Sequence, residues 1–174
     1  LSRGFILMDK CGLLEIILPE IKNLKGTEQK GKYHHKDVFY HTLEVLDNVA
    51  GKTDKFKLRF TALVHDIAKP ATKEFIEGKG WTFHGHELLG PKKIEELCKK
   101  LKISNKVRDY AMKLTRLHLR PISLADENVT DSAIRRLLVE VEDDLDDLLL
   151  FCRCDITSNN PDKIERYNNN FDRV

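Results

Sequence analysis

Residues 59–70 read RFTALVHDIAKP, an apolar stretch that carries a histidine and an aspartate side by side. Its apolar residues recur three or four positions apart. This predicts an amphipathic helix that stops before Pro70, because the residue preceding a proline disfavours helix. His65 and Asp66 stand inside the apolar run, where solvent-facing residues would be interspersed. An inward carboxylate is costly unless it is paired or bound to a cation. The stretch therefore predicts a helical fold with a buried His-Asp pair.

Most of the remaining chain also predicts helices, and we expect an all-α fold. Apolar residues at helical spacing mark segments at 38–49, 107–117, 134–141 (with Leu138 on the apolar face), 145–152 and, after Pro161, 164–171. Asp37 and Ser104 are suited to cap the first two of these helices. One excursion interrupts the pattern: residues 73–83 alternate around Glu77-Gly78-Lys79-Gly80, which predicts a small β-hairpin.

Length and composition indicate a single domain over residues 1–174 with an ordinary core, since 41% of the residues are hydrophobic and 33% are charged. The chain lacks an initiator Met, so we expect a fragment of a longer protein. No apolar run approaches the roughly 18 residues of a membrane span, and no secretory signal is visible. The four cysteines show no C-x-x-C spacing, which predicts reduced thiols and a cytoplasmic location.

Charge gives a weaker indication about partners. The net charge of +2 is uninformative, but residues 92–120 contain ten Lys and Arg against three acidic residues. This segment is a candidate surface for RNA, although a solvated helix face explains it equally well. The sequence predicts no oligomeric interface.

Two further residues join the His-Asp pair on inward helix faces. His41 adjoins the apolar stripe that begins at Val38, and Asp155 follows Cys152 by three positions. Two imidazoles and two carboxylates that converge from three helices suit Mn, Fe, Co, Ni, Zn or Mg rather than a thiolate-seeking metal. Each residue alone has a simpler explanation as a satisfied core histidine or a buried ion pair. The four together predict a metal site, with ligand atoms within about 5 Å of one another.

These residues resemble a known family. The string His41-Thr42-Leu43, followed by residues 59–70, resembles the HD superfamily of metal-dependent phosphohydrolases. The likeness is nearest to the HD region fused behind the catalytic head of bacterial tRNA nucleotidyltransferases and related poly(A) polymerases. It extends from about Leu13 to Asp155, and it includes residues 18–21, 33–35 and 83–87 and His118. The resemblance implies an HD-domain helical bundle.

The resemblance also implies a ligand set. His41, His65, Asp66 and Asp155 would bind one divalent ion, and His86 and His118 would add a second, with Asp66 bridging both. His84 competes with His86, from which it is only two residues away. Pro91 departs from the usual pattern, since it could begin a new helix and displace His86. His118 could instead be a surface residue of the basic segment.

The implied activity is metal-dependent hydrolysis of a phosphodiester, a cyclic phosphate or a nucleotide monoester, with Asp66, Lys69 and His118 as catalytic candidates. Lys69 would neutralise the phosphate, or else serve as a cation at a helix C-terminus. Substrate-binding candidates are His34, His35, Arg120 and Arg135, while Arg116 is better explained as solvated.

A second hypothesis places the domain in a tRNA nucleotidyltransferase, where it supports or contacts tRNA without catalysis. Nucleotide addition would need a further N-terminal domain, because no glycine-serine turn followed by an Asp-x-Asp pair is present. A third hypothesis is a degenerate HD domain used only for packing, against which the retention of all four ligand types argues.

Overall fold

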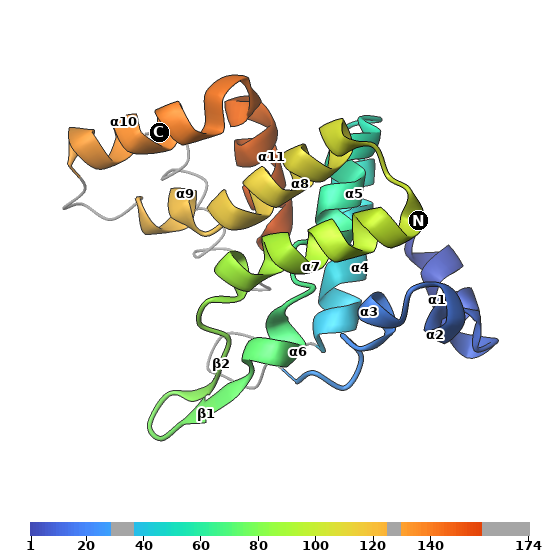
Figure 1. Ribbon diagram of the computed structural model, residues 1–174. Coiled ribbons are helices and arrows are strands. Elements are labelled where there is room, and N and C mark those ends of the chain that lie inside the picture. The colour runs from blue at the N-terminus through green and yellow to red at the C-terminus, as the bar shows by residue number, and fades with distance from the viewer. Residues whose placement is uncertain (29–36, 125–129, 158–174) are drawn as a thin grey trace.

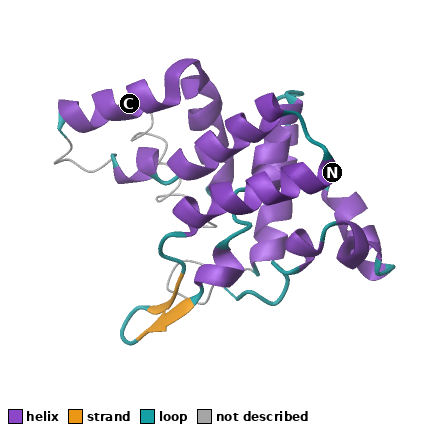
Figure 2. Cartoon of the chain, in the orientation of Figure 1, coloured by secondary structure: helices purple, strands orange, loops and turns teal. Residues whose placement is uncertain are grey.

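The computed structural model describes residues 1–28, 37–124 and 130–157. Its N-terminal part contains α1 (Ser2–Lys10), α2 (Leu13–Ile17), α3 (Pro19–Lys22), α4 (Val38–Ala50), α5 (Phe56–Val64) and α6 (Lys69–Thr72). The hairpin strands β1 (Glu74–Ile76) and β2 (Gly80–Thr82) follow. The remaining elements are α7 (His86–Leu101), α8 (Asn105–Leu117), α9 (Arg120–Ser123), α10 (Asp131–Val141), the 3₁₀ turn η1 (Glu142–Asp144) and α11 (Leu145–Asp155). The predicted all-α fold with one hairpin is confirmed (Figures 1 and 2).

Helix α5 lies at the centre of the bundle. It packs against α4 and α8, α7 packs along α8, and α11 contacts both α4 and α5. Large apolar side chains from these helices are fully buried, among them Phe39, Leu58, Ile94, Leu114 and Phe151. Any polar residue at the end of α5 is therefore surrounded by helices, and His65 and Asp66 both have no exposed surface.

The end of α5 explains how the His-Asp pair is presented. The helix ends at Val64, and the turn of residues 65–68 leads into α6, where Pro70 occupies the first turn. Proline is tolerated there because the backbone N–H at that position has no partner within the helix. The expected stop before Pro70 is confirmed, and it comes early enough for His65 and Asp66 to leave the regular helix.

Local signals at the other helix ends were partly right. Asp37 caps α4, since its carboxylate accepts a hydrogen bond of 2.9 Å from the Phe39 backbone N–H. Ser104 precedes α8, but its side chain makes no capping bond. The expected inward position of Leu138 is wrong: this side chain is 39% exposed because α10 is buried mainly through Leu137 and Val141. The helix expected at 164–171 lies outside the described residues.

Helix α7 corrects the expectation about Pro91. The helix begins at His86 and continues through Pro91, so the proline neither starts a new helix nor displaces His86. The neighbouring Gly90 has a packing role, because a Cβ built on it would lie 2.8 Å from Cγ2 of Thr115 in α8. His86 is one turn before Gly90, and His118 follows Thr115 by three residues, so this close approach also brings the two histidines together.

The predicted hairpin is confirmed in position and type. Glu74 pairs with Thr82, Phe75 with Trp81 and Ile76 with Gly80 in an antiparallel register. Gly78 and Gly80 have φ angles of 80° and 85°, which glycine adopts without the steric penalty of a side chain. Figure 1 shows the hairpin projecting from the helical body between α6 and the start of α7.

The cysteines and the helix lengths agree with the composition. Cys98, Cys152 and Cys154 are buried, Cys11 is exposed, and all four are free thiols. Among residues 1–28, 37–124 and 130–157, no helix is long and apolar enough to cross a membrane.

The Gly90 contact generates a prediction about stability. We expect Gly90→Ala to lower the free energy of unfolding by about 1–2 kcal/mol, because an overpacking cost of about 1–3 kcal/mol exceeds the helix-propensity gain of up to about 1 kcal/mol. Gly4→Ala is the matched control, since nothing lies within 4 Å of a Cβ at that position in α1. It should leave stability unchanged or raise it. Urea unfolding of both variants measures the difference, and equal effects would contradict the packing role of Gly90.

Candidate metal centre

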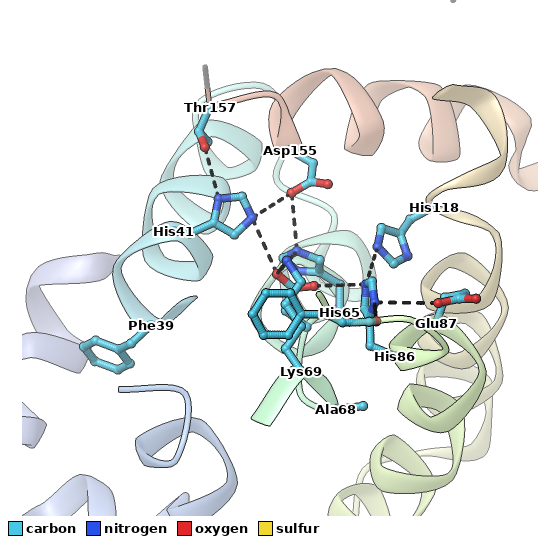
Figure 3. Close-up of polar contacts among 12 residues, drawn as sticks. Phe39, His41, His65, Ala68, Lys69, His86, Glu87, His118, Asp155 and Thr157 are labelled. Carbon is cyan, nitrogen blue, oxygen red and sulfur yellow. Dashed lines mark hydrogen bonds and ion pairs between the residues drawn. The ribbon is translucent and has the colours of Figure 1, made fainter. Parts of the chain in front are cut away.

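Six ionisable side chains from separate parts of the bundle meet at one buried place (Figure 3). They come from α4, the turn after α5, the first residue of α7, the residue after α8 and the last residue of α11; the six are His41, His65, Asp66, His86, His118 and Asp155. The four histidines are no more than 7% exposed, and Asp66 is completely buried. The sequence placed His41, His65, Asp66 and Asp155 on inward faces, and the resemblance added His86 and His118; the structure brings all six to one centre.

The first group contains His41, His65 and Asp155, whose potential ligand atoms all lie within 4.8 Å of one another. Oδ1 of Asp155 lies 3.0 Å from Nε2 of His41 and 3.4 Å from Nε2 of His65. A carboxylate oxygen and two imidazole nitrogens at this spacing can bind one divalent ion after small side-chain adjustments.

The second group contains Asp66, His86 and His118, within the same 4.8 Å limit. Nε2 of His86 lies 3.3 Å from Nε2 of His118 and 3.5 Å from Oδ1 of Asp66. His118 is only 2% exposed, so the alternative of a surface residue is wrong. His84 is exposed on the loop before α7, which leaves His86 as the inward member of that pair.

Asp66 lies between the two groups. Its Oδ2 faces the first group, at 3.2 Å from Nε2 of His65 and 3.5 Å from Nε2 of His41, while its Oδ1 faces His86. The two oxygens of one carboxylate thus point to different sets of imidazoles. This is the geometry that a carboxylate bridging two ions requires.

Backbone carbonyls orient three of the histidines. Nδ1 of His65 lies 2.9 Å from the carbonyl oxygen of Ala62. Nδ1 of His86 lies 2.8 Å from that of Phe83, and Nδ1 of His118 lies 2.6 Å from that of Thr115. In each case the acceptor is three residues earlier. A carbonyl only accepts, so Nδ1 carries the proton and donates it. In the neutral ring, Nε2 then has a lone pair aimed at the centre, the tautomer that a metal ligand needs. His65, which the carboxylates of Asp66 and Asp155 keep protonated, reaches this state only after it loses its Nε2 proton.

His41 has a different partner. Its Nδ1 lies 3.0 Å from the hydroxyl oxygen of Thr157, just beyond α11. This residue was missed from the sequence, because nothing in the local pattern around residue 157 indicates a contact 116 positions away.

Charge at the site separates the histidines into two types. Burial opposes the charging of His65, but the carboxylates of Asp66 and Asp155 outweigh it and raise the pKa of His65 to about 10. Burial lowers the pKa of His118 to about 4, and the neighbouring His65 adds to this. Burial likewise lowers the pKa of His86.

The two carboxyl groups are ionised. Burial would raise their pKa values, but nearby groups hold both pKa values well below the usual range. The charges of His65 and Lys69 do so for Asp66, and the charge of His65 with the hydrogen bond to His41 does so for Asp155. The centre thus contains two carboxylates and at least two neutral imidazoles.

Unsatisfied polar atoms test whether an ion fits. Within the described part of the chain, Nε2 of His65, Oδ1 of Asp66 and Oδ1 of Asp155 are buried without a hydrogen bond of normal geometry. Buried polar atoms left in this state are costly and rare in proteins. A divalent cation in the first group would satisfy Nε2 of His65 and Oδ1 of Asp155, and one in the second group would satisfy Oδ1 of Asp66, so the residues present fit such ions. The metals compatible with this nitrogen and oxygen set are Mn, Fe, Co, Ni, Zn and Mg.

Lys69 adds a positive charge beside the bridging carboxylate. Its Nζ lies 2.7 Å from Oδ2 of Asp66 and 5.6 Å from the centroid of the Phe83 ring. Lys69 is the first residue of the four-residue α6, and α5 ends five residues earlier at Val64. Lys69 is in place to neutralise negative charge at the centre.

The proposed substrate-binding residues are less close to the centre or lie outside the described structure. His34 and His35 fall in the segment 29–36, which is not described. Arg120, in α9, pairs with Glu140 at 2.7 Å. Arg135 is exposed on α10, where it lines a surface cavity with Asp131, Ser132, Arg136, Val139 and Glu140. Arg116 is exposed, as expected for a solvated residue.

Helix α11 supports the centre with more than Asp155. The Phe151 ring packs edge-on against His65 at 5.3 Å and lies 6.3 Å from the ring of His118. Cys152 donates its thiol hydrogen to the His118 carbonyl oxygen at 3.1 Å. The sequence marked Cys152 only as a position of the apolar stripe and did not single out Phe151, because the role of each residue depends on which helix it meets.

Comparison with known proteins agrees with this geometry. The family model described as "HD domain" matches residues 38–160. A "Multifunctional CCA protein" from Cupriavidus taiwanensis is 36% identical over 118 residues, 67% of this chain and 28% of that protein. The protein of the same name from Legionella pneumophila is 36% identical over 141 residues, which are 79% of this chain and 33% of that relative. The one from Nitrosomonas europaea is 32% identical over 145 residues, which are 78% of this chain and 34% of that relative.

The matched region thus spans about a third or less of the length of these curated relatives. The family model, in contrast, covers all six side chains of the centre and most of the chain. The chain belongs to the HD domain family.

Proposed function

We propose that this domain is a metal-dependent phosphoric ester hydrolase whose ligands are His41, His65, Asp66 and Asp155, with His86 and His118 for a second ion. The observation that carries the proposal is the position of Asp66, whose two carboxylate oxygens face separate groups of imidazoles. Such an arrangement serves two-ion sites, where a phosphate is clamped between the ions. A simple buried ion pair would need only one of the two groups.

A bound divalent ion would supply Lewis acidity and lower the pKa of a coordinated water from 15.7 towards about 7. The protein contributes orientation and charge. Backbone acceptors hold three Nε2 atoms towards the centre, and the buried walls exclude bulk water. The most exposed side chains at the centre are those of Asp155, at 15%, and Lys69, at 12%. A phosphate that reaches the centre would meet the Lys69 ammonium beside Asp66.

Lys69 would stabilise charge that grows on the phosphate oxygens, a contribution of roughly 3 kcal/mol in such sites. His118 is buried and close to His86, which supports a ligand role more than direct contact with substrate. Asp66 would hold the ions and so set the position of the attacking water.

The second candidate is contact with tRNA or another RNA without catalysis, and the similarity to Multifunctional CCA proteins supports it. The basic segment supports it less. Five of its ten cations pair with acidic side chains of this chain: Lys99, Lys100, Arg108, Lys113 and Arg120. Paired cations contribute less to binding a phosphate backbone than free ones.

Metal uptake is the first test. We expect the purified protein to bind Mn, Co or Ni with one or two ions per chain, and Asp66→Ala to lose most of this metal, because it removes ligand charge from both groups. His86→Ala should lose the second ion only. His84→Ala, an exposed histidine two residues away, is the matched control and should bind like the wild type. Elemental analysis after dialysis gives the stoichiometry; equal metal in wild type and Asp66→Ala would refute the ligand assignment.

Binding should also depend on pH in a defined direction. His65 has a pKa of about 10, so at pH 7 it holds a proton that an ion must displace. We expect release of about one proton from this residue at pH 7, and an apparent affinity that rises by up to about tenfold per pH unit towards pH 10. His118, with a pKa of about 4, should release none at pH 7. Calorimetry in buffers of different ionisation enthalpy measures the protons, and an affinity independent of pH would contradict the prediction.

Activity is the third test. We expect slow hydrolysis of a 2′,3′-cyclic nucleotide, a generic phosphodiester or a nucleotide monoester, abolished by chelation and restored by Mn, Co or Ni. Lys69→Ala should lower kcat by about 10-fold to 1000-fold, since it removes charge stabilisation near the phosphate, and should retain metal. His84→Ala again serves as the control. If no ester is hydrolysed with any of these metals while RNA binds in a salt-dependent way, the RNA-contacting function replaces the hydrolase.

A further inference from the structure

The hairpin beside the metal centre carries two exposed aromatic rings. Phe75 and Trp81 are 61% and 37% exposed, and they face each other across the two strands. Their ring centroids are 5.3 Å apart at an interplanar angle of 74°. A cross-strand aromatic pair stabilises a hairpin, and both rings keep exposed surface outside this pairing. Large aromatic surface therefore remains open to solvent on an element that projects from the body (Figure 1).

The base of this hairpin is joined to the metal centre. Phe83, the residue after β2, accepts the hydrogen bond from Nδ1 of His86 through its carbonyl oxygen, and its ring lies below the Lys69 ammonium. Trp81 is two residues earlier in the strand, roughly 7 Å along it at about 3.3 Å per residue. The hairpin thus starts at Lys69 and α6 and ends at His86, with the aromatic pair between two residues of the centre.

The charge of the hairpin indicates what the rings could bind. Lys73 and Lys79 are balanced by Glu74 and Glu77, so residues 73–83 have no excess positive charge for a phosphate backbone. The Lys73 ammonium lies over the Trp81 ring, 4.4 Å from its centroid. A ligand suited to the whole region would place an anionic group at the centre near Lys69 and a flat, uncharged ring on the hairpin.

We propose that Phe75 and Trp81 form a stacking platform for a base of a single-stranded oligonucleotide whose phosphate enters the metal centre. This inference rests on the proposed hydrolase function and names its substrate class. Phosphate and planar base occur together in nucleic acid, and bases of a single strand are available to stack, whereas those of a duplex are already stacked. A separation of several ångströms between centre and platform suits a strand of a few nucleotides, since successive bases are at least about 3.4 Å apart.

Trp81 is the single tryptophan of the chain, so its fluorescence reports directly on the platform. The experiment titrates the metal-loaded protein with single-stranded pentaadenylate ending in a 2′,3′-cyclic phosphate, and with inorganic phosphate as a ligand that has no base. We expect quenching of Trp81 by the oligonucleotide and none by phosphate. The dissociation constant is measured independently by anisotropy of a labelled oligonucleotide.

Four variants separate stacking from folding. Phe75→Ala and Trp81→Ala should weaken oligonucleotide binding by about 10-fold each, and Trp81→Phe should restore it to within about threefold of wild type. Phe56→Ala is the matched control: this ring is 60% exposed and stacks on Phe60 at the end of α5 far from His65, so its loss should not change binding. If Trp81→Ala and Trp81→Phe bind the oligonucleotide with similar affinity, the stacking role is overturned.

Metal content and hydrolysis of glycerol 1,2-cyclic phosphate, which has no base, are measured in the same variants. Retained metal and unchanged turnover of this ester, with weaker oligonucleotide binding, support the platform. If the Phe75 and Trp81 variants keep metal and turnover and also bind the oligonucleotide as tightly as the wild type, the platform is overturned and the hydrolase function stands. Absent metal or turnover in the wild type would instead refute the proposed function. Dimerisation that is lost in Trp81→Ala would also overturn the proposal, because the rings would then cover a second copy of the chain.

Discussion

The burial of the Asp66 carboxylate is the constraint around which the domain is organised. An ionised carboxyl group with no exposed surface would destabilise an apolar core by several kcal/mol unless positive charge or hydrogen-bond donors surround it. Imidazoles from three helical segments and the Lys69 ammonium provide that compensation. None of these groups is adjacent to Asp66 in the chain except His65, so the carboxylate links the stability of the centre to the packing of the whole bundle.

Two features of the fold place the imidazoles correctly around the Asp66 carboxylate. Backbone carbonyls three residues before His65, His86 and His118 fix the orientation of each ring, so three imidazoles present the same nitrogen to the same point. The absence of a side chain at Gly90 lets α7 approach Thr115 of α8 closely, and His86 and His118 meet one turn away. Orientation is thus decided locally, whereas position is decided by helix packing.

The centre is buried, and Asp155 and Lys69 keep the most exposure among its side chains. Helix α11 closes one side with Phe151 and holds the His118 carbonyl through Cys152. The hairpin continues from Lys69 to His86 and carries its aromatic pair outward. Lys69 and His86 at the centre and the exposed aromatic pair therefore belong to one continuous segment, residues 69–86. Under the proposed function, this continuity would let a nucleic-acid strand reach the centre without a strongly basic surface.

The sequence by itself determined much of this protein. Helical periodicity and turn residues were sufficient to predict the all-α class, the helix from Val38 with its Asp37 cap, and the hairpin at 73–83, because these depend on contacts between residues close in the chain. Ionisable residues at apolar positions also singled out His41, His65, Asp66 and Asp155, since burying them without a partner would be unfavourable. Their role as metal ligands remains a prediction, but their convergence is a property of the structure.

Only the tertiary structure decided between alternatives that look alike in one dimension. His84 and His86 are two residues apart, and helix α7 begins at the second, so one is exposed and the other faces Asp66. The continuation of α7 through Pro91, the contact of Thr157 with His41 and the pairing of Lys69 with Asp66 likewise escaped local reasoning. The physical reason is that periodicity reports which face of a helix is apolar but not which other face it meets. The contacts of His86 with His118 and of His41 with Thr157 join residues 32 and 116 positions apart in the sequence. Such contacts are set by packing between helices, as at Gly90 and Thr115.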